Sequence, residues 1–162
     1  MRKLNPDHLS SVIGIINDCP FFKHMSMRVM EIGIGYSIVA ATILKNHMNP
    51  FGGLHGGVYA SAIDTAAYWS AYCDLPEDKG LVSIDIKVDF IAPIVDGEIL
   101  VKGNSIKAGK SIHLTEAKMF NSDGKLLAHG TSKLLVTQNK QSINDIVEYI
   151  GSNKLPEKFI RS

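Results

Sequence analysis

Three kinds of chemical group lie close together in the first half of the chain. Gly56 and Gly57 end a glycine-rich segment, Asn49 and His55 place polar side chains beside it, and Asp64 follows in an otherwise apolar run. Backbone N–H groups at a helix start stabilise an oxygen on which negative charge develops, and a carboxylate can act as base or nucleophile. The combination is typical of a site that acts on a carbonyl group. The alternative is that the glycines only let a loop enter a packed helix.

Asp64 is the most informative of these residues, because an unpaired carboxylate is costly to bury. With 3.6 residues per turn, one stripe of a helix carries Gly57, Ser61, Asp64 and Tyr68. The carboxylate therefore points along the same line as the glycine turn. We expect Asp64 to have a partner or a chemical role, and a local cap at a break in the helix is the alternative.

Three helices are predicted. Residues 58–72 contain neither Gly nor Pro and are apolar nearly all round, which predicts a long helix buried on most sides. Helical spacing of apolar residues predicts a short amphipathic helix over residues 6–17, ended by Pro20. Residues 142–150 predict another helix, and the residues after 151 are typical of a loose end.

Strands account for most of the remaining chain. Residues 28–44 predict two strands joined by a glycine turn, and four more strands are predicted over residues 81–91, 98–107, 111–120 and 125–136. The connections among these four resemble hairpins, so we expect a meander. The order predicts an α+β fold in which an antiparallel sheet wraps around a long central helix. Residues 25–138 would form this domain, residues 1–24 an N-terminal helix and lead-in, and residues 139–162 a C-terminal helix and tail.

Composition excludes several classes of protein. A chain of 162 residues suits one domain, and 17 basic against 16 acidic residues implies neither nucleic acid nor a membrane as partner. No apolar run could span a membrane and no signal peptide is recognisable, so we expect a cytoplasmic location. Cys19 and Cys73 predict buried free thiols. No metal is expected, and four histidines are predicted to be ordinary structural residues: His24, His47, His113 and His129.

Five features in order resemble the hotdog-fold thioesterases of the PaaI-like group. They are residues 49–57, Asp64, Ser83, residues 90–93 and residues 107–110. The resemblance covers about residues 19–136 and implies a hotdog homodimer, commonly doubled to a dimer of dimers, with active sites between two subunits. It also implies an acyl-CoA thioesterase that hydrolyses acyl- or aryl-acyl-CoA to free acid and CoA without a cofactor.

The resemblance implies a role for the polar residues of the motif. Asp64 would be the nucleophile or general base, acting on a thioester held by the glycine turn of the other subunit. Asn49 would help to fix the thioester carbonyl, and His55 would contribute a hydrogen bond near the reacting group or the leaving sulfur. Ser83 would position the water, although serines on exposed strands are common.

Substrate binding is implied for the glycines and for a lysine pair. Gly56 and Gly57 would hold the carbonyl oxygen through free N–H groups. Cations near a glycine turn suit a phosphate that remains partly in solvent, so Lys107, Gly109 and Lys110 are predicted to bind the phosphates of CoA. The alternative is an ordinary β-turn flanked by lysines.

Two other functions compete. A hotdog enoyl-CoA hydratase or dehydratase would also hold an acyl thioester at a helix start, with its acid and base arranged differently. A non-catalytic acyl-CoA-binding sensor would carry a DNA-binding element, for which the first 25 residues are too short. Tyr68, Trp69 and Tyr72 predict core packing, with one ring at the end of an acyl pocket as the alternative. The acyl specificity, the covalent or water-based mechanism and the tetramer packing stay open.

Overall fold

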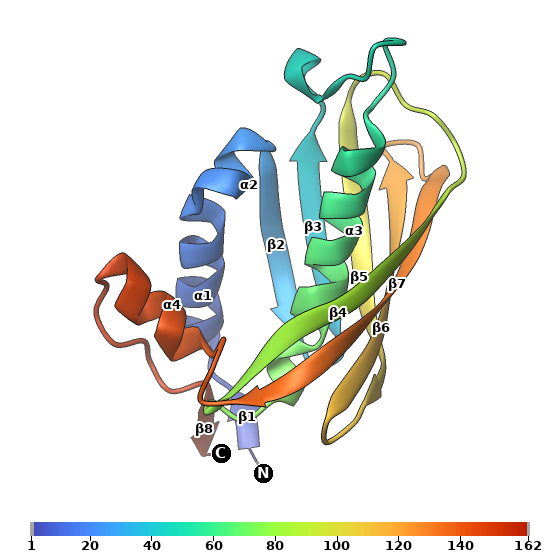
Figure 1. The fold of residues 1–162 in the computed structure, drawn as a ribbon. Coiled ribbons are helices and arrows are strands. Elements are labelled where there is room, and N and C mark those ends of the chain that lie inside the picture. Colours follow the sequence, from blue (N-terminus) through green and yellow to red (C-terminus); the bar gives the residue numbers. More distant parts are fainter. Residues whose placement is uncertain (1, 162) are drawn as a thin grey trace.

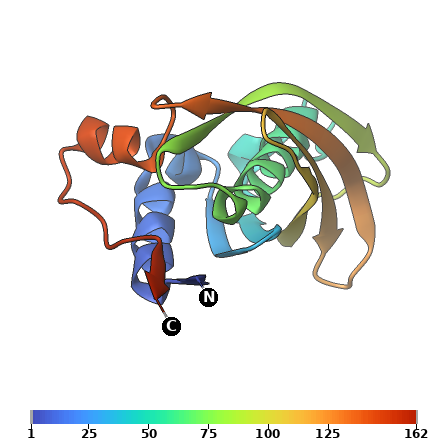
Figure 2. The ribbon, with the colours of Figure 1, turned by 90° about the horizontal axis from the view of Figure 1, so that it is seen from below.

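The computed structural model describes residues 2–161, in which a six-stranded antiparallel sheet wraps around a long helix, α3 (Gly56–Ser70). The strand order is β2-β3-β5-β6-β7-β4, and Figures 1 and 2 show the sheet curving around α3. The strands are β2 Met27–Gly33, β3 Tyr36–Thr42, β4 Lys79–Phe90, β5 Glu98–Ala108, β6 Ile112–Asn121 and β7 Leu126–Gln138. This is the predicted hotdog architecture.

Small residues let α3 approach the sheet closely. A Cβ atom on Gly103 of β5 would lie 2.1 Å from the carbonyl oxygen of Ala66, and the Ser37 hydroxyl donates to that oxygen at 2.6 Å. A Cβ atom on Gly130 of β7 would lie 2.5 Å from the side chain of Ile63. The helix and the concave face therefore share one core, whose buried side chains include Val39, Ile63, Ala66, Val101, Met119 and Leu127.

Two helices precede the sheet, α1 (Pro6–Asp18) and α2 (Pro20–His24). The Asn17 side chain joins α1 to β2, since its oxygen accepts from the Val29 N–H at 2.7 Å and its amide donates to the Val29 carbonyl at 2.9 Å. We expected Pro20 only to end the first helix. Pro20 also starts α2, because the first position of a helix needs no backbone N–H.

The expected meander is wrong at β4. Two hairpins join β5, β6 and β7 as predicted, but β4 pairs with β7 and not with β5. Residues 91–97 therefore cross from one edge of the sheet to an inner strand instead of forming a hairpin. Their Pro and Gly residues mark a change of direction but do not specify which strands pair, because pairing depends on the faces that must cover α3. As a result β4 is an edge of the sheet.

The end of the chain is not the loose tail that we expected. The predicted helix is present as α4 (Ile143–Ile150). Beyond it the chain returns to the body of the protein, where β8 (Phe159–Arg161) pairs with β1 (Arg2–Leu4). Figure 1 shows the two ends of the chain side by side below α1.

Lys158 anchors this return. Its side chain is 1% exposed, and Nζ donates to the carbonyl oxygens of Tyr72 and Leu75 just beyond the C-terminal end of α3. The ammonium group also lies 3.9 Å from the centroid of the Tyr72 ring, a favourable cation–π distance. Because the partners are two backbone carbonyls and a ring face, the pattern of side-chain types does not reveal this contact.

The two cysteines differ in burial. Cys19 and Cys73 are both free, and Cys73 is buried as predicted, but Cys19 is only partly buried at the junction of α1 and α2. Within residues 2–161, no helix combines the length and the apolar character that crossing a membrane requires.

Replacing Lys158 by Met should lower the free energy of unfolding by about 3 kcal/mol, because two buried carbonyl oxygens lose their donor. Urea denaturation followed by circular dichroism measures this change. Lys154→Met is the matched control, since Lys154 is exposed in the same segment, and it should change stability by less than about 0.5 kcal/mol. An equal effect in both variants would contradict the anchoring role.

Candidate active site

Asn49 organises the glycine-rich loop that precedes α3. Its side-chain oxygen accepts the backbone N–H groups of Phe51 at 2.9 Å and of Gly53 at 3.1 Å. The backbone N–H of Asn49 also donates to the Gly53 carbonyl at 2.8 Å. Asn49 therefore does form the turn, which was the alternative to a role in the reaction. The NH₂ group of the Asn49 side chain remains available as a donor.

His47 holds the same loop from inside, a role that we did not predict. The ring is 3% exposed, its Nδ1 accepts the Leu44 N–H at 3.1 Å, and its Nε2 donates to the His24 carbonyl at 3.3 Å. The backbone carbonyl of His47 accepts the His55 N–H at 2.9 Å. A histidine among polar loop residues carries no signal of this role in the sequence.

His55 is the N-cap of α3. Its Nδ1 atom accepts the backbone N–H of Gly57 at 2.8 Å, so the neutral ring carries its proton on Nε2, and the side chain is exposed. The expectation that both glycines offer free N–H groups is therefore wrong for Gly57. The Gly56 N–H makes no hydrogen bond within residues 2–161 and remains available to a ligand.

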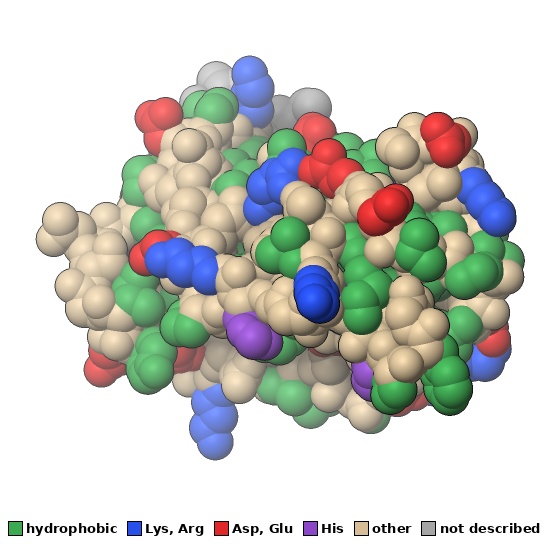
Figure 3. Space-filling model, turned by 90° about the horizontal axis from the view of Figure 1, so that it is seen from above, with side chains coloured by type: hydrophobic (Ala, Val, Ile, Leu, Met, Phe, Trp, Pro, Cys, Tyr) green, Lys and Arg blue, Asp and Glu red, His purple; other side chains and the backbone are tan. Residues whose placement is uncertain are grey.

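An apolar depression of about 390 Å³ lies beside Gly56. Phe90 at the end of β4 forms one wall, and the Tyr59 hydroxyl donates to the Ala92 carbonyl at 3.0 Å behind it. Figure 3 looks onto this end of the molecule and shows apolar side chains at the surface. Exposed apolar side chains at this end are Leu44, Phe51, Phe90, Ile91 and Val95.

Asp64 faces a second depression of about 360 Å³, lined by α3 and β4. Burial raises the pKa of its carboxyl group, and a hydrogen bond from the Ser83 hydroxyl at 3.4 Å opposes part of that rise. A raised pKa makes the carboxylate a stronger base near neutral pH. The alternative of a cap at a helix break is wrong, because α3 continues unbroken through Asp64.

The two depressions cannot act on one carbonyl group within a single chain. Gly56 and Asp64 are eight residues apart on α3, which corresponds to about 12 Å along the helix axis. Reacting atoms must approach to about 3–3.5 Å. Both depressions lie beside β4, one of the two edge strands, and are called the Gly56 half-site and the Asp64 half-site.

Tyr68 follows Asp64 by one turn of α3. Burial, with a smaller contribution from the Asp64 charge, raises the pKa of Tyr68 to about 12. Its hydroxyl donates to the Leu81 carbonyl of β4 at 3.1 Å, and its ring meets Trp69 edge-on at 5.2 Å. The ring is thus fixed between α3 and β4, next to the Asp64 half-site.

The predicted lysine pair lies on the β5–β6 hairpin. Lys107 and Lys110 are exposed and make no ion pair within the described part of the chain. A Cβ atom on Gly109 would lie 2.3 Å from the Ile112 carbonyl oxygen, so the turn requires glycine. Register places the hairpin in one row with Ser83, three strand spacings or about 14 Å away. Among residues 2–161, no cluster of His, Cys, Asp or Glu could hold a metal ion.

Comparison with known proteins identifies the family. A model described as the Thioesterase superfamily matches residues 51–128. Acyl-coenzyme A thioesterase 13 of Mus musculus is 31% identical over 127 residues, which cover 76% of this chain and 90% of that protein. The chain belongs to the thioesterase superfamily.

Solved structures of other proteins share the fold. A thioesterase from Haemophilus influenzae aligns with a TM-score of 0.75 at 21% identity, covering 82% of this chain and 92% of that chain. The phenylacetic acid degradation protein PaaI from Thermus thermophilus aligns with a TM-score of 0.66 at 19% identity, covering 72% and 98%. The family match contains both half-sites but not α1 or α4.

The structure groups the predicted site residues in three places. Asn49, His55 and Gly56 lie at the start of α3, Asp64 and Ser83 lie between α3 and β4, and the lysine hairpin lies apart from both. Sequence reasoning missed the apolar wall formed by β4 itself. The signal in the sequence was the alternation of apolar with polar residues along β4, whose apolar members Val82, Ile84 and Ile86 remain exposed.

The Asp64 pKa can be tested without reference to turnover. Ser83→Ala should raise it further, because the hydroxyl stabilises the ionised carboxylate. Carbon-detected NMR titration of the Asp side chains measures the shift. Asp85 is an internal control, since hydrogen bonding to Lys133 keeps its pKa below the ordinary value. A fall of the Asp64 pKa in Ser83→Ala would contradict the assigned contact.

Proposed function

We propose that the protein is an acyl-CoA thioesterase whose active site forms between two copies of the chain. The carrying observation is that the Gly56 N–H and the Asp64 carboxylate lie on one helix, about 12 Å apart, and both open beside the β4 edge. A second copy can bring its Gly56 to the Asp64 of the first. The kinship with acyl-coenzyme A thioesterase 13 supports CoA thioesters as the substrate class.

The β4 edge supports a homodimer. The strand is long and carries exposed apolar side chains, with Ile84 54% and Phe90 61% exposed, features that invite pairing with another strand. Ser83 marks the level of Asp64, and Phe90 marks the level of Gly56. For the half-sites to meet, residue 83 of one copy must lie opposite residue 90 of the other. The twofold axis would then cross β4 between Ile86 and Lys87. Association of two such dimers stays a prediction.

The reaction divides between the two copies. In one copy the Gly56 N–H donates to the thioester carbonyl oxygen, and the Nε2–H of His55 faces the leaving sulfur. In the other copy Asp64 takes a proton from a water held with Ser83, while the water oxygen bonds to the carbonyl carbon. The carbon–sulfur bond then breaks, and the thiolate of CoA takes up the proton. The side-chain NH₂ group of Asn49 supports the bound thioester from the loop.

Binding of CoA completes the proposal. The exposed ammonium groups of Lys107 and Lys110 suit the CoA phosphates, with Gly109 shaping the hairpin between them. Since Gly57 uses its N–H to cap α3 through His55, its contribution is to form the helix start and not to contact the carbonyl. No cofactor takes part, and a cytoplasmic location stays a prediction.

Asp64→Asn should lower kcat by about 10²–10⁴-fold, because the amide cannot accept the proton. Release of CoA thiol from a panel of aryl and straight-chain acyl-CoA substrates measures the activity. Asp123→Asn removes an exposed carboxylate in the β6–β7 turn and should match wild type. If wild type and Asp64→Asn bind acyl-CoA equally and neither releases thiol, the protein is a sensor. If enoyl-CoA is hydrated instead, the protein is a hydratase.

Gly56→Pro should lower kcat by about 10²–10³-fold, because proline removes the N–H that holds the carbonyl oxygen. Proline suits the first position of a helix, and the preceding residue His55 has the extended backbone that proline requires. Gly56→Ala keeps the N–H, and its Cβ would lie 3.5 Å from Phe90, an ordinary contact. The alanine variant should therefore remain within a few-fold of wild type.

Mixing the two inactive variants tests the shared site. In a mixed dimer of Asp64→Asn with Gly56→Pro, one of the two sites is intact. An equal mixture after subunit exchange should regain about a quarter of wild-type activity, since half of the dimers are mixed. No recovery, with exchange verified by mass, would show that each site lies within one chain.

A further inference from the structure

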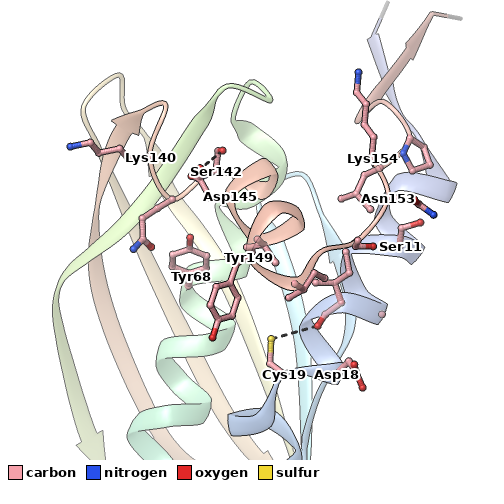
Figure 4. Close-up of a pocket in the computed structure, with 18 of the residues that line it drawn as sticks. Ser11, Asp18, Cys19, Tyr68, Lys140, Ser142, Asp145, Tyr149, Asn153 and Lys154 are labelled. Atoms are coloured by element: carbon pink, nitrogen blue, oxygen red, sulfur yellow. Dashed lines mark hydrogen bonds between the residues drawn. The ribbon is translucent and has the colours of Figure 1, made fainter.

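A groove of about 1490 Å³ lies outside the two half-sites, between α1, α4 and the returning segment after Gly151. Its volume exceeds the roughly 300–1,000 Å³ that is usual for small-molecule pockets. Figure 4 shows Tyr68 from α3 and Tyr149 from α4 entering this space, with Cys19 at its lower end. Apart from Tyr68, the residues that line the groove lie outside the part of the chain that matches the family model.

Part of the groove lining is apolar and suits a hydrocarbon chain. Ile15 comes from α1, Ile146 and Ile150 come from α4, and Leu155 comes from the returning segment. Tyr149 is 90% exposed and Ile150 45% exposed, so the concave wall keeps apolar surface in contact with water. A long apolar ligand would cover that surface and gain the free energy of burial.

The acidic groups that line the groove are already engaged. Asp18 forms an ion pair with Lys23, and Asp145 accepts the backbone N–H and the hydroxyl of Ser142 at the start of α4. Both carboxylates therefore have partners of their own within the protein. Tyr68 lines the groove from the side of α3.

Tyr68 connects the groove to the Asp64 half-site. It follows Asp64 by four residues on α3, which is about 6 Å along the helix axis. Its hydroxyl is held by the Leu81 carbonyl, two residues before Ser83 on β4. Tyr68 lines the groove and lies one helical turn beyond Asp64, so an acyl chain that runs from Asp64 along α3 must pass this ring to reach α1 and α4.

We propose that the groove binds the distal part of a long, straight acyl chain, which makes long-chain acyl-CoA the substrate class. The proposal rests on the proposed thioesterase function. The thioester lies at Asp64, the chain passes Tyr68, and the methyl end lies among Ile15, Ile146 and Leu155. Short and aryl-acyl groups end before the groove and do not use it.

Gly14 allows a sharp test, because it lines the groove and a Cβ atom there would meet nothing within 4 Å. Gly14→Phe should fill the space without a clash. Ser10→Phe adds the same ring to an exposed position of α1 outside the groove and serves as the matched control. Thiol release from butyryl- to palmitoyl-CoA measures kcat/KM against chain length.

In wild type, kcat/KM should rise by up to about fourfold per added methylene over the length of the groove. Gly14→Phe should lower the ratio of palmitoyl to butyryl kcat/KM at least about tenfold, while Ser10→Phe keeps the wild-type ratio. If acyl-CoA is hydrolysed but Gly14→Phe does not change the dependence of kcat/KM on chain length, the groove proposal is overturned and the thioesterase function is not. Absence of hydrolysis at every length would overturn the thioesterase function.

A binding measurement separates the groove from the chemistry. Trp69 is the only tryptophan of the chain, contacts Tyr68, and lines a small space together with Ile146. Titration with free palmitate should change its fluorescence, and Gly14→Phe should weaken that binding at least about tenfold. Equal binding in both proteins would overturn the proposal. The proposal would also be overturned if Gly14→Phe lost activity equally at all chain lengths and a dimer dissociated. That result would assign the groove to a second copy of the chain.

Discussion

The burial of α3 is the constraint on which the rest of the structure depends. An apolar helix of 15 residues must be enclosed, and glycines on the strands let the sheet close around it. The same rigid helix carries the Gly56 N–H at its start and Asp64 halfway along, so their separation is set by helix geometry. The separation of the two groups within one chain is therefore a direct consequence of the fold, and the proposal of a site shared between two copies rests on it.

Several polar side chains of the site hydrogen-bond to backbone groups and so hold the loop before α3 in place. Side-chain atoms of three residues accept backbone N–H groups of this loop, namely Asn49, His47 and His55. These bonds shape the turn and leave the Gly56 N–H as a donor without a partner among the described residues. Lys158 similarly uses its ammonium group on two carbonyls beyond α3 and ties the end of the chain to the central helix. The groove between α1 and α4 exists because that return is held in place.

Local patterns were sufficient for α1, α3 and α4, though not for α2, and for the type and approximate bounds of the sheet strands. The apolar run predicted α3, and alternation with turn residues predicted β2, β3 and β4–β7. Local patterns were insufficient for the position of β4 in the sheet. The turn residues of segment 91–97 are compatible with a hairpin and with a crossover, so they do not specify which strand pairs with β4. Local patterns were also insufficient for residues 151–161, where the Lys158 ammonium group contacts backbone carbonyls and ring faces.

By itself, the sequence determined which groups are available for chemistry: a glycine turn at a helix start, one carboxylate on an apolar helix and a serine on the following strand. Spacing along one helix is a local property, so it could be deduced in advance. Only the tertiary structure decided which N–H is free, that Ser83 meets Asp64, and that Tyr68 stands between Asp64 and a groove. Those facts depend on contacts between residues far apart in the chain, which arise only when the sheet closes around α3.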